Sequence, residues 1–283
     1  MTAGSRPPGT ASDRPGFVSL VGAGPGDPEL LTLRAARRLA EADLLLYDGL
    51  VPAEVTALAT RAQHFSVSKR AGSPSIDQET IQQVMIRGAR RGKRVVRLKN
   101  GDPFLLGRGG EEALALRAAG IPFEVVPGVT AAVAAPSVAG IPVTHRGLAA
   151  GFTVVSGHAP AAFEPILGAV APGSMTVIVL MGLRNRDRIA ALLLERGWPA
   201  PTPAAIVLAA STPRMRHWTG RLDELGAAPL DGPAGEPGTI VVGAVVNLSA
   251  RIGGTALPAR TAEAVALPTE HFDETQTSKE RVR

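Results

Sequence analysis

The sequence contains no cysteine, which excludes disulfide frameworks, thiolate metal sites and thiol nucleophiles. Aromatic residues are also scarce, with two Trp, one Tyr and seven Phe among 283 residues. A nucleic-acid-binding surface usually interleaves basic clusters with aromatic side chains, so the sequence does not favour a nucleic-acid partner. Lysine occurs only four times, and the net charge of +5 therefore comes from arginine. Two explanations of this composition are open. Either arginine is selected to bind an anionic partner through its planar guanidinium, or it reflects a genome-level preference for arginine codons.

Long hydrophobic runs are absent as well. The longest uncharged stretch, 125–144, is interrupted by proline and glycine, so it predicts a buried strand, a turn and a short helix instead of a membrane span. Residues 1–15 lack the apolar segment of a secretory signal. We therefore expect a cytoplasmic protein that has no membrane partner.

The composition is that of a folded protein, because 45% apolar against 19% charged residues excludes an intrinsically disordered chain. From Phe17 onward, strand-like and helical segments alternate, which is typical of an α/β fold with a largely parallel sheet. The expected strands are 17–21, 44–47, 94–98 and 123–126, and the expected helices are 29–41, 52–60, 77–90 and 111–119.

The chain changes character after Thr144. Four strand-like runs follow, at 152–156, 176–180, 204–208 and 240–246, with one clear helix at 187–196. This pattern predicts a second, strand-rich domain whose sheet has strands of mixed direction. These patterns divide the chain into four segments: a flexible leader (1–15), an N-terminal α/β domain (16–148), a C-terminal α/β domain (149–254) and a disordered tail (255–283).

Glycine-rich segments follow the first strands. Segment 22–28 suggests a nucleotide-binding turn, but Asp27 stands where the dinucleotide fingerprint G-x-G-x-x-G needs its third glycine. Pro25 and Pro28 also remove N–H donors, so a tight structural turn is an equal alternative. Loop 97–112 leaves the end of another strand, where open α/β sheets bind ligands, and it carries four glycines.

These segments together resemble the uroporphyrinogen-III C-methyltransferases and the methyltransferase half of siroheme synthases, across about residues 16–250. The motif GAGPGDP is common to the wider family of tetrapyrrole methyltransferases, whereas GRGGEE and THR are more selective for the uroporphyrinogen enzyme. The matching segments are VGAGPGDPELLTL, YDGLV around Asp48, KRAG at Lys69, GDPF, GRGGEE, VVPGVTAA, GIPVTHR, SGH at 156–158 and VVG at 241–243.

The resemblance implies the two-domain α/β tetrapyrrole methylase fold, with S-adenosylmethionine bound in the cleft between the domains of a homodimer subunit. It implies ten cofactor-binding residues: Pro25, Asn100, Gly101, Asp102, Leu105, Thr130, Ala131, Met181, Ala210 and Gly243. Asn100 stands where the family usually has glycine. We expect this turn to survive, because asparagine tolerates left-handed dihedral angles better than other side chains.

The implied reaction is methylation of uroporphyrinogen III at C2 and C7, through precorrin-1 to precorrin-2, in siroheme and cobalamin biosynthesis. S-adenosylhomocysteine is the second product, and no metal takes part. Asp48 and Lys69 match a proton acceptor and a proton donor, and Arg108, Glu111 and Arg146 match positions for substrate binding or catalysis. Arginines suit a substrate with eight carboxylates, and a carboxylate such as Asp48 favours positive charge developing on the macrocycle.

Structural interpretations of the same residues stay open. Asp48 and Glu111 would also suit helix N-termini, and Arg108 and Arg146 would also suit a solvated surface. Three other functions remain as alternatives: a later precorrin methyltransferase of cobalamin synthesis, a non-catalytic protein that binds tetrapyrrole or cofactor, and a nucleic-acid-modifying methyltransferase.

Overall fold

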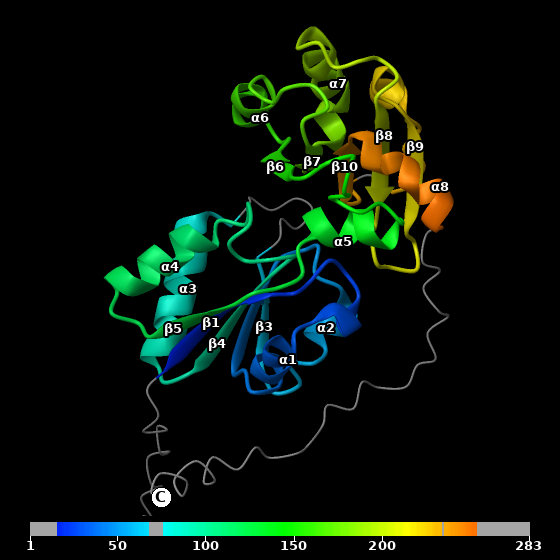
Figure 1. The fold of residues 1–283 in the computed structure, drawn as a ribbon. Helices are drawn as coiled ribbons and strands as arrows, with labels where there is room; N and C mark the ends of the chain where they lie inside the picture. The colour runs from blue at the N-terminus through cyan, green and yellow to red at the C-terminus, as the bar shows by residue number, and fades with distance from the viewer. Residues whose placement is uncertain (1–15, 68–75, 234, 254–283) are drawn as a thin grey trace, which may run out of the picture.

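The computed structural model describes residues 16–67, 76–233 and 235–253. The predicted leader, the predicted tail and Lys69 lie outside these residues. The described chain forms two five-stranded sheets, one after the other along the sequence, each covered by helices (Figure 1). In the described part of the chain, no helix is long and apolar enough to cross a membrane.

The first sheet is entirely parallel, as the sequence predicts, with strand order β3-β2-β4-β1-β5. Most of its strands are near-continuous runs of Val and Leu, as expected where both faces of a sheet are covered. The polar edge strand β3 lacks this pattern, and the sequence did not predict it. The strands are β1 Phe17–Gly22, β2 Leu44–Tyr47, β3 Gln63–Ser66, β4 Arg94–Lys99 and β5 Phe123–Val126.

Two helices pack on each face of this sheet. On one face, α1 (Leu33–Ala40) and α2 (Ala53–Thr56) bury Leu39 and Val55 against the strands. On the other face, α3 (Gln78–Arg90) and α4 (Gly109–Ala118) bury side chains such as Met85 and Leu116.

The helix predicted over 29–41 is wrong at its start. The 3-10 turn η1 (Pro28–Leu30) comes first, and α1 begins only after Thr32, whose hydroxyl caps the helix by accepting from the Ala35 amide at 3.2 Å. The predicted helix 52–60 is likewise longer than α2.

The neighbouring strands β1 and β4 lead to opposite faces of the sheet. From β1 the chain enters α1 on one face, and from β4 it enters α4 on the other. The loops after these two strands therefore diverge and leave a crevice between them. Ligands of open α/β sheets bind at such a switch point, outside the carboxyl ends of the strands.

The second sheet is mixed, as predicted, with strand order β6-β7-β10-β8-β9. Only β6 and β7 pair in parallel, and the other neighbours are antiparallel. The sequence did not predict β9, whose residues RHWTGR alternate between half-buried and exposed at the sheet edge. The strands are β6 Phe152–Ser156, β7 Thr176–Leu180, β8 Pro203–Leu208, β9 Arg216–Arg221 and β10 Gly238–Val242.

Helical segments cover both faces of the second sheet. One face carries α6 (Pro160–Leu167), α7 (Arg186–Glu195) and the 3-10 turn η3 (Leu222–Ala227). The other carries α5 (Ala131–Val138) and the turn η4 (Ala244–Leu248). The sequence did not predict α6.

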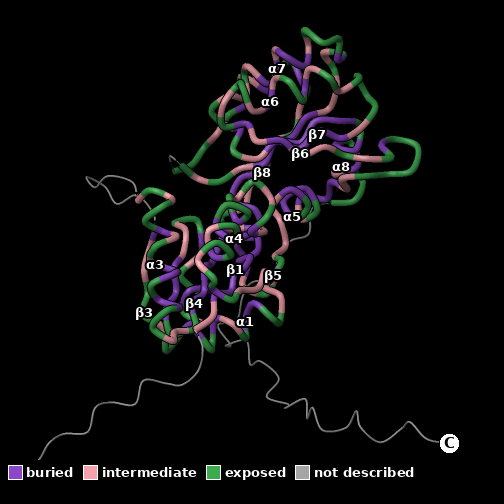
Figure 2. Tube along the Cα trace, turned by 90° about the vertical axis from the view of Figure 1, so that its left-hand side faces the viewer, coloured by how far each residue is buried: buried purple, intermediate pink, exposed green. Residues whose placement is uncertain are grey.

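Helix α5 joins the two lobes. It precedes the expected domain division at 148/149, yet its residue Ala135 packs in one cluster with Val207 and Val241 of the second sheet. Figure 2 shows α5 where the lobes meet, with the buried residues concentrated in the strands of both sheets. The division into 16–148 and 149–254 stays a prediction.

Candidate active site

A cavity of about 420 Å³ lies at the switch point of the first sheet, between the two lobes. Its volume is in the range of small-molecule sites, which is about 300–1,000 Å³. Loops after β1, β2 and β4 and the start of α5 form one wall, and the ends of β7 and β8 with the start of β10 form the other.

This cavity brings together most of the predicted cofactor-binding residues. Nine of the ten line it: Pro25, Asn100, Gly101, Asp102, Leu105, Thr130, Ala131, Met181 and Ala210. They come from loops far apart in the sequence, which the two sheets place side by side.

Gly243 is the exception, and the structure corrects its placement. β10 runs antiparallel to β7, so the end of β10 lies beside the start of β7. A Cβ added to Gly243 would lie 3.4 Å from the Thr176 Cα, at the end of the sheet away from Met181. Gly243 does not line the cavity.

Glycines allow the loops under the cavity to pack backbone against backbone. Gly24 and Gly101 form a two-way backbone bridge, with N···O distances of 3.2 and 2.8 Å. A Cβ on Gly22 would lie 2.5 Å from the Gly128 Cα, and one on Gly128 would lie 2.2 Å from the Gly101 oxygen. Gly22 and Gly128 therefore serve loop packing, which is the structural alternative that the sequence left open.

Asp102 and Asn100 have different roles beside these glycines. The Asp102 carboxylate accepts from the amides of Phe104 at 2.8 Å and Gly128 at 3.0 Å, and so ties two loops together. The Asn100 side-chain oxygen is buried with no hydrogen-bond donor. The left-handed residue of this turn is Gly101, at φ 67°, so the left-handed conformation considered for Asn100 is not used.

Backbone strain is concentrated around the cavity. Among the described residues, five that are not glycine have positive φ, at a cost of roughly 1–3 kcal/mol each. Leu106 and Met181 line the cavity themselves. Ala209 and Ser211 flank the lining residue Ala210, and Arg108 follows the lining residue Gly107. Such clustering is typical of ligand sites.

Asp48 lies in the cavity wall directly after β2. Its side chain is 33% exposed, and its Oδ1 is 2.6 Å from a guanidinium nitrogen of Arg97, which is only 3% exposed. Asp48 is therefore a carboxylate that faces the cavity from one side and a buried cation from the other.

Behind Arg97 lies a second, fully buried carboxylate, Glu112 of α4. One of its oxygens, Oε1, accepts from Arg97 at 3.0 Å, from Lys99 at 3.2 Å and from Gln78 at 2.9 Å. Burial, together with the neighbouring Arg97 charge, lowers the pKa of Lys99 from its ordinary value, although Glu112 and Asp48 oppose this.

The other predicted catalytic residues lie apart from the cavity wall. Arg108 and Glu111 form a two-bond ion pair at the start of α4, at 2.9 and 2.7 Å, with both side chains more than half exposed. The hydrogen bond from Arg108 lowers the pKa of Glu111. Arg146 is exposed in the turn that a bridge between His145 and Ala149 closes.

The sequence did not single out Glu236, which lines the second-sheet wall of the cavity. Its side chain is 6% exposed, and its Oε2 is 2.5 Å from Arg216. Its buried Oε1 has no hydrogen-bond donor, and the Arg214 Nε lies 3.9 Å from it. The cavity wall therefore holds a carboxylate oxygen that could accept a hydrogen bond from a ligand.

Residues 18–226 match the family described as Tetrapyrrole (Corrin/Porphyrin) Methylases, over well more than half of the chain. The chain belongs to the tetrapyrrole methylase family. This confirms the resemblance and the two-domain α/β fold that the sequence predicts.

Individual relatives of this tetrapyrrole methylase agree. It is 44% identical over 236 residues to the uroporphyrinogen-III C-methyltransferase of Methanocaldococcus jannaschii, covering 82% of this chain and 98% of that protein. It is 44% identical over 238 residues to siroheme synthase 2 of Serratia proteamaculans, covering 84% of this chain but only 50%, or half the length, of that protein. A crystal structure of the Thermus thermophilus uroporphyrin-III C-methyltransferase with S-adenosylhomocysteine superposes with a TM-score of 0.70 at 43% identity, covering 82% of this chain and 100% of that one.

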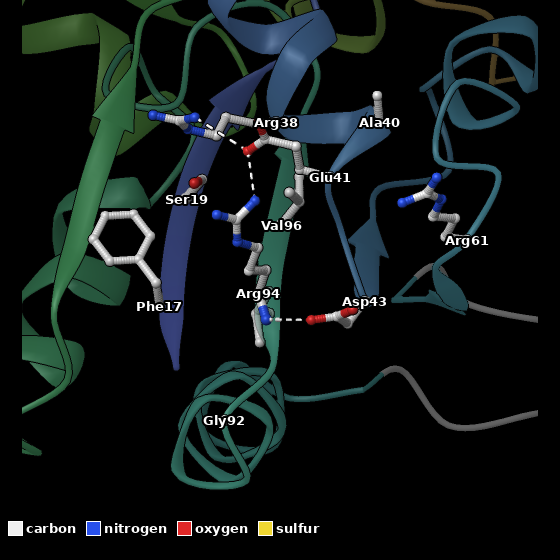
Figure 3. A pocket seen from close by; sticks show the side chains of 11 residues that line it. Phe17, Ser19, Arg38, Ala40, Glu41, Asp43, Arg61, Gly92, Arg94 and Val96 are labelled. Carbon is white, nitrogen blue, oxygen red and sulfur yellow. Dashed lines mark hydrogen bonds and ion pairs between the residues drawn. The ribbon is translucent and has the colours of Figure 1, made fainter. Parts of the chain in front are cut away.

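The tetrapyrrole methylase has a second hollow, of about 630 Å³, at the amino end of the first sheet (Figure 3). None of the predicted site residues lines it. Two of its arginines pair with acidic neighbours: Arg94 with Glu41 at 2.9 Å, and Arg38 with Glu124 beside it. The smaller cavity between the lobes is therefore the candidate active site. In the described residues, no three His, Asp or Glu side chains come together as a metal site.

Sequence reasoning missed the buried charges of this tetrapyrrole methylase, although one signal was present. Arg97 and Lys99 alternate with apolar residues in β4, on the face that also carries Val95. A strand covered on both faces rarely carries charge, so two basic residues there indicate a buried acidic partner. Which acid pairs with them depends on the packing of α4.

Proposed function

We propose that this chain is a uroporphyrinogen-III C-methyltransferase. It transfers methyl groups from S-adenosylmethionine to C2 and C7 of uroporphyrinogen III, through precorrin-1 to precorrin-2, and releases S-adenosylhomocysteine. One observation carries the proposal: the cavity between the lobes gathers nine of the ten cofactor-binding residues that the motifs predict. The chain also matches nearly the whole length of a relative that is named for this reaction.

The cavity fits S-adenosylmethionine chemically. The buried oxygens of Asn100 and Glu236 have no donors, and the amino and hydroxyl groups of the cofactor can donate to them. Met181, Val207 and Ala210 supply apolar surface suited to the adenine ring. When bound, the cofactor supplies an electrophilic methyl group on a sulfonium.

Asp48 serves as the carboxylate of the reaction in this proposal. Attack by a pyrrole carbon brings positive charge into the macrocycle, and a carbon-bound proton must then leave. Asp48 faces the cavity, so it can favour that charge electrostatically and accept the proton. The remaining rate enhancement comes from holding the reacting carbon in line with the methyl group. Lys69, the proposed donor, lies outside the described residues.

Arginines are proposed to bind the carboxylates of the macrocycle. Arg184 lines the cavity and is exposed. Arg108 follows the lining residue Gly107, and it can exchange its Glu111 partner for a substrate carboxylate of the same geometry. Arg146 keeps its proposed role in substrate binding, from outside the cavity wall.

The proposal includes a homodimer in the cytoplasm, with a small-molecule substrate and neither nucleic acid nor membrane as partner. Light scattering coupled to size-exclusion chromatography measures the molar mass in solution. A dimer would give twice the chain mass of 29.2 kDa, and a monomer would remove this part of the proposal.

The deciding experiment incubates the purified chain with uroporphyrinogen III and methyl-labelled S-adenosylmethionine, followed by mass analysis of the tetrapyrrole. We expect two added methyl groups with wild type and a strongly reduced yield with Asp48→Asn. Methylation of a later corrinoid but not of uroporphyrinogen III would support a precorrin methyltransferase instead. Tight cofactor binding without turnover on either substrate would support a non-catalytic binding protein.

A further inference from the structure

A line of alternating charges runs from the interior of the first lobe to the cavity. It begins at buried Glu112 of α4, continues through Arg97 of β4, and ends at Asp48 in the cavity wall. The residues lie far apart in the sequence, but they share one face of the sheet, because β2 and β4 are neighbours and α4 covers them.

We propose that Arg97 is a positioning residue, which Glu112 holds in place and which in turn fixes Asp48 for proton transfer. The inference deepens the proposed function, since it rests on the role of Asp48 there. Arg97 itself does not line the cavity, so it acts through Asp48 alone.

The guanidinium of Arg97 is fixed from three directions. Its Nε donates to Glu112 at 3.0 Å, one terminal nitrogen donates to the Leu98 carbonyl at 3.2 Å, and the other lies 2.6 Å from Asp48. A planar group held at three points cannot turn without breaking a buried bond. Asp48 is therefore held through Oδ1.

Because the line contains two cations and two carboxylates, Arg97 can be replaced without leaving a buried carboxylate unpaired. Two buried cations, Arg97 and Lys99, face the buried carboxylate Glu112 and the cavity carboxylate Asp48. If Arg97 is replaced by methionine, Glu112 keeps its contacts to Lys99 and Gln78, and no carboxylate is left buried without a partner. Asp48, one-third exposed, then has water in place of the guanidinium.

Stability alone does not account for this arrangement. Buried ion clusters are weak evidence for stability, because replacing them by apolar residues of similar volume is often neutral or stabilising. A rigid line of charges that ends at the proposed proton acceptor is expected instead to lower the cost of reorganisation during the reaction.

A kinetic double-mutant cycle between Arg97→Met and Asp48→Asn tests the inference. In the wild-type background we expect Arg97→Met to lower kcat about 10- to 100-fold, with KM for both substrates changed less than about threefold. In the Asp48→Asn background the same substitution should change kcat less than about twofold, because Arg97 acts through Asp48. A purely structural role would give equal losses in both backgrounds, and that result would overturn the inference.

Arg38→Met is the matched control, since it breaks a partly buried ion pair between Arg38 of α1 and Glu124 of β5, in the same lobe but away from the cavity. It should leave kcat unchanged. If Arg97→Met does not fold, Arg97→Lys keeps the charge but loses the fork, and it enters the same cycle.

A crystal structure of the Arg97 variant gives a readout that needs no activity. We expect the Asp48 carboxylate to leave its wild-type position or to occupy several rotamers. An unmoved, ordered Asp48 would overturn the inference even if the chain proved not to methylate uroporphyrinogen III. Conversely, an active wild type with an additive cycle would leave the proposed function standing and remove only this inference.

Discussion

At the residue scale, the polar side chains of the cavity form two groups according to what they contact. Asp102 and Thr130 accept hydrogen bonds from backbone amides and so hold the loops in place. Asn100 and Glu236 each keep a buried oxygen with no donor. A buried unpaired acceptor costs about 1–3 kcal/mol, so a ligand that donates to these oxygens removes a cost already present in the free protein.

Asp102 offers the sharpest prediction of this kind. Replacing it by alanine removes the acceptor of the Phe104 and Gly128 amides, and hydrogen bonds to a charged group contribute about 1.5–3 kcal/mol each. We expect Asp102→Ala to weaken S-adenosylhomocysteine binding at least about tenfold in isothermal titration, because the lining loop around Asn100 loses its anchor.

Asp223→Ala is the control for this measurement, because the Asp223 carboxylate also accepts two hydrogen bonds, here from the Arg221 guanidinium, but does not line the cavity. The S-adenosylhomocysteine dissociation constant of Asp223→Ala should equal that of the wild-type protein. An unchanged dissociation constant for Asp102→Ala would show that the loop does not form the cofactor site.

At the scale of elements, two helices of the first lobe differ in how they begin. α3 begins at Asp77, whose carboxylate accepts from the Thr80 amide at 2.7 Å, and this hydrogen bond lowers the pKa of Asp77. α4 instead begins after Arg108, which is left-handed and gives no side-chain cap. The capped helix supports the fold, whereas the uncapped start lies next to the cavity.

We predict that Asp77→Ala lowers the melting temperature at pH 7 by roughly 2–4 °C, the usual effect of losing an N-cap in a protein of this size. Because the folded pKa of Asp77 is lowered, its stabilisation is present above the unfolded pKa and is lost as pH falls through the folded pKa. Thermal melts of both proteins should therefore converge toward acidic pH. A difference that stays constant with pH would contradict the assignment of the cap.

The sequence could predict those elements whose pattern is local. Loops rich in glycine after strands identified the crevice, and runs of Val and Leu identified most strands of the first sheet. β9 was missed because Trp218 is its single large apolar side chain, and α6 because it contains Pro160 and Pro165. Gly243, predicted to bind the cofactor, lies at the end of the second sheet away from the cavity, because strand direction is not visible in a motif.

The charged line to Asp48 shows the same limit within the site. Asp48 and Arg97 are 49 positions apart and become neighbours only because β2 pairs with β4. The partner of a buried charge depends on sheet order and helix packing, which composition and spacing do not specify. Glu236 is similar, because it reaches the cavity only through the antiparallel placement of β10 between β7 and β8.

At the scale of the whole molecule, contacts beside the cavity connect the two lobes. Helix α5 packs on the second sheet but starts at Thr130, beside the loops of the first. Ser211 of the second lobe accepts a hydrogen bond from the Asp27 amide of the first at 3.2 Å. A ligand in the cavity contacts both lobes at once, so it should act as an additional connection between them.

This arrangement predicts how the cofactor product changes global stability. A ligand that binds only the folded state at 100 times its dissociation constant adds about 2.7 kcal/mol to the free energy of unfolding. Scanning calorimetry with S-adenosylhomocysteine at that level should raise the melting temperature by roughly 5–10 °C. Because the ligand bridges the lobes, both should shift together in one transition, and Asp102→Ala at the same concentration should shift less. Stabilisation confined to one of two separate transitions would mean that the ligand binds a single lobe, and the site between the lobes would then be wrong.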